Sequence, residues 1–213
     1  MRLKQQWLGS GIDYQHGLNM QHELVERILS GGKDNYLLSL EHSPVYTIGR
    51  TRDMSSLGED TSRLPHPVIE TNRGGQATYH GPGQLTAYPV VDLRPLGKDL
   101  HAYIRAIEEA LIQTCHHYQV QASRRDGLTG VWVGTRKLAS IGVGVKKWIS
   151  MHGFAINITR QSLDGFLPIT PCGIHDVVMT CLEEEAAQNI SVETFAQQCQ
   201  AHLEDALGQM QMA

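Results

Sequence analysis

Hydrophobic positions repeat at helical spacing in three parts of the chain. In the second of them, Leu100, Ile104 and Ile107 fall on one face, as expected for a helix that packs against a core. Each stretch follows a residue whose side chain can cap a helix start, and the glycine pair at 31–32 can end the first helix. The predicted helices cover residues 13–30, 99–118 and 192–207, with Asp13, Asp99 and Ser191 as their caps.

Short apolar runs separated by turn residues predict more strands than helices. The predicted strands cover residues 2–7, 35–41, 45–48, 67–71, 85–93, 120–123, 129–133, 137–145, 151–157 and 177–182. Gly134-Thr135 predicts a tight hairpin turn, and many other joins are short. This pattern favours an α/β (α+β) fold with a mixed, largely antiparallel sheet and packed helices, and it argues against a doubly wound parallel sheet. Without repeats or linkers, we expect a single domain over residues 1–213.

The composition is that of an ordinary globular protein, with 41% hydrophobic and 19% charged residues. The net charge of −4 is not the basic balance of a chain that binds nucleic acid. The N-terminus has no apolar signal segment, and no apolar run approaches the length that spans a membrane. We therefore expect a cytoplasmic protein without nucleic-acid or membrane partners.

The most informative segment is Arg73-Gly-Gly-Gln-Ala-Thr-Tyr-His-Gly-Pro-Gly-Gln84. Its glycines allow positive φ angles and close backbone approach, while Pro82 fixes φ and removes a hydrogen-bond donor. Predicted strands flank this loop, which is a placement typical of binding and catalytic loops. A plain hairpin connection is the alternative, but loops of this length are uncommon without a function. Within the loop, we expect His80 to point at a ligand.

Cys172 differs from the other cysteines because it lies in a constrained turn between a proline and a glycine. Cys115, Cys181 and Cys199 fall in predicted helices or a strand, where a buried thiol acts as a small hydrophobic group. The residues alone leave two interpretations of Cys172 open, a nucleophile or a structural thiol. The cysteine spacing offers no four-ligand zinc set, so we expect no metal.

A nucleophilic cysteine needs a nearby positive charge or base, because the thiolate is the reactive form. Lys137 is a candidate, since it begins an apolar strand rather than lying on a charged face. An ammonium beside a thiol lowers the thiol pKa, and the reverse transfer lets the amine act as a base. Two alternatives remain open: Lys137 is only a charge at a hairpin end, or His175 is the base.

The glycine-rich segment matches neither common nucleotide-binding motif. No Gly-Lys-Ser/Thr follows its glycines, and it precedes a strand rather than opening a helix. We therefore expect no nucleotide and no other cofactor. Gly142, Gly144 and Gly153 lie in or beside strands, where a missing side chain allows close approach. Together with the loop, these glycines predict a slot for an elongated ligand.

Four segments, taken together and in order, closely resemble the octanoyl-[acyl-carrier-protein]:protein N-octanoyltransferases, the lipoyl (octanoyl) transferases of lipoate biosynthesis. They are residues 73–84, Lys137-Leu-Ala-Ser-Ile-Gly142, His152-Gly-Phe-Ala-Ile-Asn157 and Pro171-Cys-Gly173, and Ser43-Pro-Val-Tyr-Thr-Ile-Gly-Arg50 fits the same family. No motif position departs from the family pattern, whereas the predicted C-terminal helix carries no motif.

The resemblance implies an α/β fold like the catalytic domains of biotin and lipoate protein ligases. By motif position, it implies that Cys172 is the acyl-thioester nucleophile and that Lys137 is its partner. It also implies which residues surround the acyl substrate, namely Arg73, Gly74, Gly75, Gln76, Ala77, Thr78, Tyr79, His80, Ser140, Ile141, Gly142, Gly153, Phe154 and Ala155.

The implied reaction transfers an octanoyl group from octanoyl-acyl carrier protein to a lysine of an acceptor protein. The implied acceptors are the lipoyl domains of 2-oxoacid dehydrogenase complexes and the glycine cleavage H protein. Two other functions stay open: an ATP-dependent lipoate or octanoate protein ligase, and a non-catalytic acyl-binding module. An acidic carrier needs a local basic patch, for which the candidates are Arg50, Arg52, Arg124, Arg125, Lys146 and Lys147. We expect a monomer.

Overall fold

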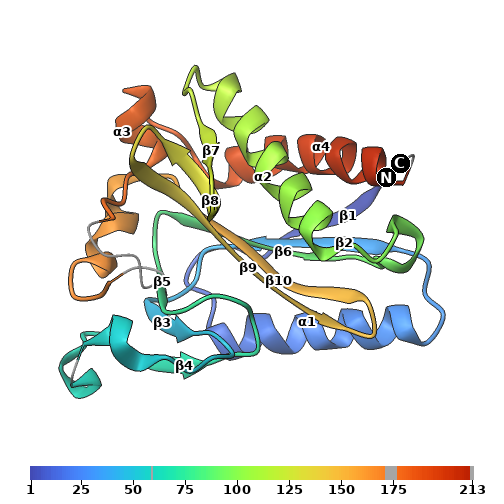
Figure 1. The fold of residues 1–213 in the computed structure, drawn as a ribbon, viewed down its shortest axis with the longest axis horizontal. Coiled ribbons are helices and arrows are strands. Elements are labelled where there is room, and N and C mark those ends of the chain that lie inside the picture. Colours follow the sequence, from blue (N-terminus) through green and yellow to red (C-terminus); the bar gives the residue numbers. More distant parts are fainter. Residues whose placement is uncertain (59, 171–176, 212–213) are drawn as a thin grey trace.

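The computed structural model describes residues 1–58, 60–170 and 177–211. The strands of its central sheet are β1 (Leu3–Trp7), β2 (Asn35–Leu40), β6 (Gln84–Val90), β7 (Ser123–Arg125), β8 (Leu128–Val133), β9 (Arg136–Lys146) and β10 (Ile149–Asn157). Their order across the seven-stranded sheet is β1-β2-β6-β10-β9-β8-β7 (Figure 1). β1 and β2 are parallel and the other neighbouring pairs are antiparallel, which confirms the predicted mixed sheet.

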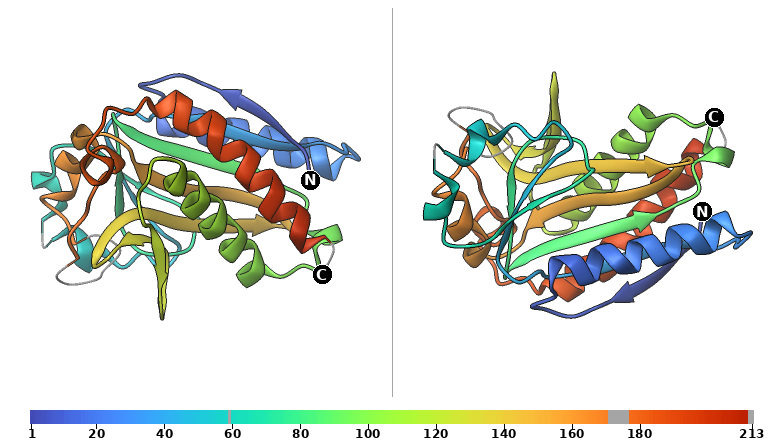
Figure 2. Two further views of the ribbon diagram at one scale, coloured as in Figure 1. Left: turned by 90° about the horizontal axis from the view of Figure 1, so that it is seen from above. Right: turned by 90° about the horizontal axis from the view of Figure 1, so that it is seen from below.

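Three long helices cover the two faces of this sheet, because each carries one apolar face. Helices α2 (Leu100–His117) and α4 (Val192–Met210) pack side by side on one face, and α1 (Tyr14–Leu29) lies on the other (Figure 2). The predicted caps are confirmed, since Asp13, Asp99 and Ser191 each accept a hydrogen bond from a backbone N–H three residues later.

A second, three-stranded sheet lies beside α1. Two of its strands confirm those predicted over residues 45–48 and 67–71, whereas the third strand and the separate sheet were not predicted. The sheet contains β3 (Val45–Ile48), β4 (Val68–Glu70) and β5 (Thr78–His80), in the order β4-β3-β5. Short strands within turn-rich sequence give weak periodic signals, so β5 was hidden inside the predicted glycine-rich loop. The first half of that loop is tied to both sheets: Arg73 O accepts from Arg50 N at 2.9 Å, and Gly74 N donates to Val143 O at 2.9 Å.

Short helical turns fill the connections around the second sheet and at the ends of the strands. They are η1 (Met54–Leu57), η2 (Thr61–Arg63), η3 (Arg94–Leu96), η4 (Arg160–Phe166) and α3 (Leu182–Ala186). None of the helices in the described part of the chain is long and apolar enough to cross a membrane.

Two predicted strands differ from the structure. The strand expected over residues 120–123 is instead a connection whose apolar side chains join the core, and β7 begins only at Ser123. The strand expected over residues 177–182 is reduced to a single bridge between Met179 and Lys137. Its last residue, Leu182, begins α3, because three glutamates and an alanine follow and favour a helix.

Candidate functional site

A mainly apolar slot lies between the central sheet and the loop at residues 73–76. It contains about 450 Å³ of empty space when its solvent-open mouth is included. The slot is lined by Tyr14, Arg73, Gly74, Gly75, Gln76, Thr78, His80, Thr86, Tyr88, Ser140, Ile141, Gly142, His152, Gly153, Phe154 and Ala155. Three segments that are distant in sequence therefore meet here: the glycine-rich loop, the middle of β9 and the middle of β10.

Glycines on β9 and β10 make the close approach of these segments feasible. A Cβ atom at Gly142 would lie 2.9 Å from the Gly74 carbonyl oxygen, and one at Gly153 would overlap the Ala87 carbonyl oxygen. A side chain at Gly142 would push the loop away from β9, and a side chain at Gly153 would push the neighbouring strand β6 away from β10. The missing side chains leave room for the slot along the sheet.

Substitution of Gly142 by alanine is expected to damage the slot more than the fold. The new methyl group would meet Gly74 O at 2.9 Å and Arg73 Cδ at 3.2 Å, so the loop must shift. We expect a loss of about 100-fold in kcat/KM, as follows from a small misplacement of substrate in the slot.

Gly74→Ala is the matched comparison, because its methyl group would lie 3.5 Å from Val143 O, an ordinary contact. Its loss in kcat/KM should be clearly smaller than that of Gly142→Ala. Equal activities in the two variants, with unchanged thermal midpoints, would mean that the close packing at Gly142 has no part in substrate binding.

Arg73 anchors the loop through a buried guanidinium that is 7% exposed. Its Nη2 donates to the Thr47 carbonyl oxygen at 2.7 Å and to Thr47 Oγ1 at 2.8 Å, and its Nη1 donates to Gly74 O at 3.0 Å. Hydrogen bonds from a charged donor are stronger than neutral ones and fix orientation. The arginine therefore holds the loop against β3 and places a positive charge beside the slot.

A hydrogen-bonded chain leads from this arginine through the inner wall of the slot. Thr47 Oγ1 lies 3.3 Å from His80 Nε2, and His80 Nδ1 lies 2.8 Å from Gln84 Oε1. The amide of Gln84 donates to Asn157 Oδ1 at 3.0 Å, and Asn157 Nδ2 donates to Thr180 O at 3.0 Å. Because Gln84 Oε1 accepts, His80 carries its proton on Nδ1 and leaves Nε2 as an acceptor.

A second buried chain closes the slot beside α1. Tyr14 is hydrogen-bonded to Tyr88, whose hydroxyl lies 2.6 Å from His42 Nε2, and His42 Nδ1 donates to Ile12 O at 2.8 Å. These side chains come from α1, from β6 and from the turn after β2, so the slot is closed by three elements. Each polar atom named here has a partner, as buried polar groups require.

Burial sets the charge state of this wall. It lowers the pKa of His42 and of His152 to about 4 and holds that of His80 well below its ordinary range. The guanidinium of Arg73 adds to the lowering at His80 and His152. Burial also raises the pKa of Tyr14 to about 12. Near neutral pH these groups are uncharged, which suits an apolar ligand.

The slot does not include all residues that the resemblance implied around the substrate. Thr78 and His80 line it, whereas Ala77 and Tyr79 lie in a separate small core with Tyr46 and other apolar side chains. Side chains alternate between the two faces of a strand, so successive residues of β5 cannot all face the same ligand. Ala77 and Tyr79 pack in this small core rather than in the slot.

Lys137 lies near the start of β9, outside the slot lining. Its side chain is 2% exposed, and its Nζ lies 5.3 Å from the centre of the Trp132 ring. Its backbone N donates to Val178 O at 2.8 Å, and its carbonyl oxygen accepts from Thr180 N at 3.0 Å. The Lys137 side chain is therefore buried, whereas that of Arg136 is exposed and pairs with Glu185.

Cys172, its flanking residues and His175 lie outside the described residues. The other three cysteines are buried, and burial raises the pKa of each thiol, to about 12 for Cys199. Buried thiols of this kind are inert, as the sequence predicted for Cys115, Cys181 and Cys199.

Four lining residues were not predicted as ligand contacts, namely Tyr14, Thr86, Tyr88 and His152. Tyr14 begins α1 and the next two lie in β6, and nothing in their local pattern indicates a ligand. His152 directly precedes the implied contacts Gly153 to Ala155. Its place next to them in the sequence could have indicated that it also lines the slot.

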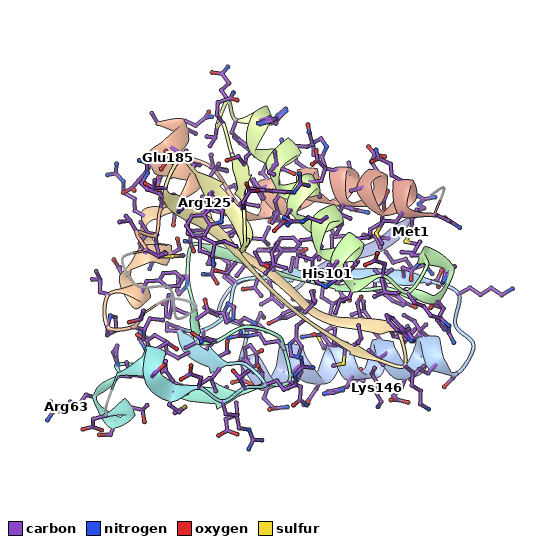
Figure 3. All side chains as sticks on the ribbon, viewed as in Figure 1. Met1, Arg63, His101, Arg125, Lys146 and Glu185 are labelled. Atoms are coloured by element: carbon purple, nitrogen blue, oxygen red, sulfur yellow. The ribbon has the colours of Figure 1, made fainter. Side chains whose placement is uncertain are left out.

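The candidate basic residues do not form one patch. Arg50, Arg52 and Lys146 border a cavity next to the slot, whereas Arg124 pairs with Glu108 and Arg125 lies over the Trp132 ring. Figure 3 shows Arg125 and Lys146 well apart on the molecule. Within the described ranges, no group of three or more His, Cys, Asp or Glu residues could hold a metal ion.

Comparison with solved structures shows which fold this is. The bi-partite lipoate protein ligase of Thermoplasma acidophilum superposes with a TM-score of 0.69 at 15% identity, covering 98% of this chain and 84% of that one. Biotin protein ligase from Aquifex aeolicus, in complex with biotin and ATP, superposes with a TM-score of 0.63 at 13% identity, covering 98% and 72%. These likenesses confirm the fold that the resemblance implied.

Sequence comparison shows the family. Residues 13–204 match the lipoyl protein ligase A/B catalytic domain. The octanoyltransferase of Geotalea uraniireducens (strain Rf4) is 45% identical over 184 residues, which cover 85% of this chain and 82% of the relative. The octanoyltransferase of Geobacter metallireducens is 46% identical over 171 residues, which cover 80% of this chain and 78% of the relative. The chain therefore belongs to the lipoyl protein ligase A/B catalytic family and, within it, to the octanoyltransferases, the acyltransferases of lipoate synthesis.

Proposed function

We propose that this octanoyltransferase takes its acyl group from octanoyl-acyl carrier protein and passes it to a lysine of a lipoyl-domain or glycine cleavage H protein. The acyl group is carried in between as a thioester on Cys172. The slot is the observation that carries this proposal. Its glycine-lined floor follows β9, and the buried Lys137 lies near the start of the same strand.

The first half-reaction is a thioester exchange. The Cys172 thiolate attacks the carbonyl carbon of the donor thioester and forms a new S–C bond. The bond to the carrier's sulfur breaks, and the carrier leaves as a thiol after taking one proton. An acyl thioester is as activated as its donor, so this step needs no further energy source.

The second half-reaction forms the amide. The amine of the acceptor lysine attacks the octanoyl-Cys172 carbonyl, loses a proton, and releases the cysteine as a thiol. Lys137 supplies the positive charge that favours the thiolate and moves the proton in both steps. Its burial supports this role, because a charge in a low-dielectric site acts more strongly than an exposed one.

The inert character of the other cysteines supports the choice of Cys172. Cys115 and Cys199 are fully enclosed in the helix layer, and Cys181 is buried at the start of α3. None of these thiols can reach a substrate without local unfolding. A role for Cys172 as nucleophile would also explain its place between a proline and a glycine, away from any apolar stripe.

The nature of the acyl donor separates this proposal from the ATP-dependent alternative. We expect transfer from octanoyl-acyl carrier protein to a lipoyl domain without nucleotide, and none from free octanoate with ATP and magnesium. The measurement is the intact mass of the acceptor lipoyl domain after each incubation. Transfer only from octanoate and ATP would identify a ligase, and stoichiometric octanoate binding without a modified acceptor would identify an acyl-binding module.

The proposal extends to the setting of the reaction. The whole chain acts as one catalytic domain, as a monomer in the cytoplasm, where its carrier and acceptor proteins occur. The acidic donor docks near the Lys137 end of the slot, where Arg125 lies over Trp132 and Lys137 lies beside the same ring. Electrostatic complementarity of this kind mainly accelerates encounter.

A further inference from the structure

A second cavity lies next to the acyl slot, and the two have His152 in common. The second cavity contains about 1160 Å³ of empty space when its solvent-open side is included, against about 450 Å³ for the slot. Its border is mixed: Leu18, Val145 and Met151 are apolar, and the charged and polar side chains are His22, Arg50, Arg52, Glu70, Thr71, Asn72 and Lys146. His152 is thus a wall between a narrow apolar slot and a wider, more polar space.

His152 is held by α1 through its backbone, and its ring rests on β9. Its backbone N donates to Gln21 Oε1 at 2.7 Å, and its φ angle is +56°. A Cβ atom at Gly144 would lie 3.3 Å from its Cδ2, so the ring rests directly on the glycine surface of β9. The side chain is 3% exposed.

This arrangement does not favour stability. A left-handed φ costs energy in a residue with a side chain, and within the described residues His152 Nδ1 is buried without a hydrogen-bond partner. A histidine with these two penalties calls for an explanation other than packing.

His152 lies at the far end of the slot from Lys137. In the sheet it pairs with Val143, six positions after Lys137 on β9, which corresponds to about 20 Å along the strand. The slot floor at Ser140, Ile141 and Gly142 lies between these two points. An acyl chain whose carbonyl carbon lies at the Ser140 end of this floor therefore points its methyl end toward His152.

We propose that His152 closes the acyl slot at this end and sets the upper limit on the length of the acyl chain that the enzyme transfers. The inference rests on the proposed function, because it assumes that the slot holds the acyl group.

The dimensions agree with a short chain. The floor from Ser140 to Val143 measures about 10 Å along the strand. An extended chain advances about 1.2 Å per bond, as an extended backbone does, so the seven C–C bonds of an octanoyl group span about 8 Å. Four further methylene groups add about 5 Å and would reach the histidine ring.

The test compares acyl lengths in wild-type protein and in two variants, His152→Gly and His152→Ala. Glycine adopts positive φ without strain, so His152→Gly removes the wall and keeps the backbone. Initial rates with octanoyl-, decanoyl- and dodecanoyl-acyl carrier protein give kcat/KM for each length. We expect the dodecanoyl-to-octanoyl ratio of kcat/KM to rise about tenfold or more in both variants.

His22→Ala is the matched control, because this exposed histidine borders only the second cavity. Its length profile should equal that of the wild type. An unchanged profile in both His152 variants would overturn the inference, and so would a wild-type enzyme that transfers dodecanoyl groups as fast as octanoyl groups. The second result needs no variant, so the inference stays testable if the variants fold poorly.

Binding of free fatty acids separates this inference from the proposed function. Dissociation constants for octanoate and dodecanoate are measured by calorimetry on the same proteins. If wild-type protein transfers no octanoyl group, the proposed function fails. Stronger dodecanoate binding to His152→Gly than to wild type would still support the wall, and equal binding would refute it.

Discussion

Octanoyl transfer is expected to fall by about 10⁴-fold or more in a Cys172→Ala variant, because loss of a nucleophile removes the covalent route. The same variant should lack a covalent adduct that wild-type protein forms with octanoyl-acyl carrier protein when no acceptor is present. The measurement is the intact mass of the enzyme before and after treatment with hydroxylamine, which cleaves thioesters.

The control for this experiment is Cys181→Ala, a buried cysteine close in sequence. It should keep both the adduct and most of the transfer activity, because burial raises the pKa of the Cys181 thiol and keeps it protonated. An adduct that persists in Cys172→Ala would assign the nucleophile elsewhere. Undiminished transfer without any adduct would indicate direct attack of the acceptor lysine on the donor.

The second large effect is expected at Lys137. Methionine matches the length of its aliphatic chain and suits the buried site, so Lys137→Met removes the charge and the proton carrier with little loss of packing. We expect acylation to slow by about 10²–10⁴-fold, the range that general acid–base groups contribute. Single-turnover acylation, followed by mass, measures this step without acceptor.

The pH dependence distinguishes a chemical role from a structural one. Without the ammonium, the nucleophile forms its thiolate only as the pH approaches the ordinary cysteine pKa of about 8.5, so acylation by Lys137→Met should rise with pH up to that value. Wild-type acylation should rise less over the same range. A deficit that does not change with pH would identify Lys137 as a structural residue only.

Arg136→Met is the matched control for Lys137→Met, since it removes the neighbouring positive charge on the same strand. Arg136 is exposed and pairs with Glu185, and exposed ion pairs contribute little to stability. Its acylation rate should stay close to that of the wild type. A similar loss in both variants would show that overall charge at the start of β9, rather than a buried amine, matters.

Helix positions and the sheet class were predictable from the sequence because they depend on neighbouring residues. Capping at Asp13, Asp99 and Ser191 involves backbone groups within one turn, and apolar spacing along α2 reflects one buried face. Short joins such as Gly134-Thr135 indicated antiparallel pairing, and the sheet confirms it. The segments that resemble the octanoyltransferase family also indicated the fold, which the structural comparisons confirm.

The second sheet and the exact extent of the strands were not predictable in this way. β3 and β4 match the strands predicted over residues 45–48 and 67–71, but β5 has three residues, too few to display a period, and the pairing of β4 and β5 with β3 is a long-range interaction. The same limit explains why residues 177–182 formed only a bridge with Lys137 rather than a strand. A pairing partner, more than local composition, decides whether such a run becomes a strand.

The sequence by itself indicated the candidates for the chemistry: a glycine-rich loop, a lysine at the start of a strand, and a cysteine between proline and glycine. Only the tertiary structure decided how the glycine-rich loop, β9 and β10 combine into a slot. Gly74 N donates a hydrogen bond to Val143 O, Arg73 donates one to Thr47 O, and His152 lies between two cavities. These contacts join segments that are far apart in the chain. The close packing that creates them therefore cannot be predicted from the local sequence.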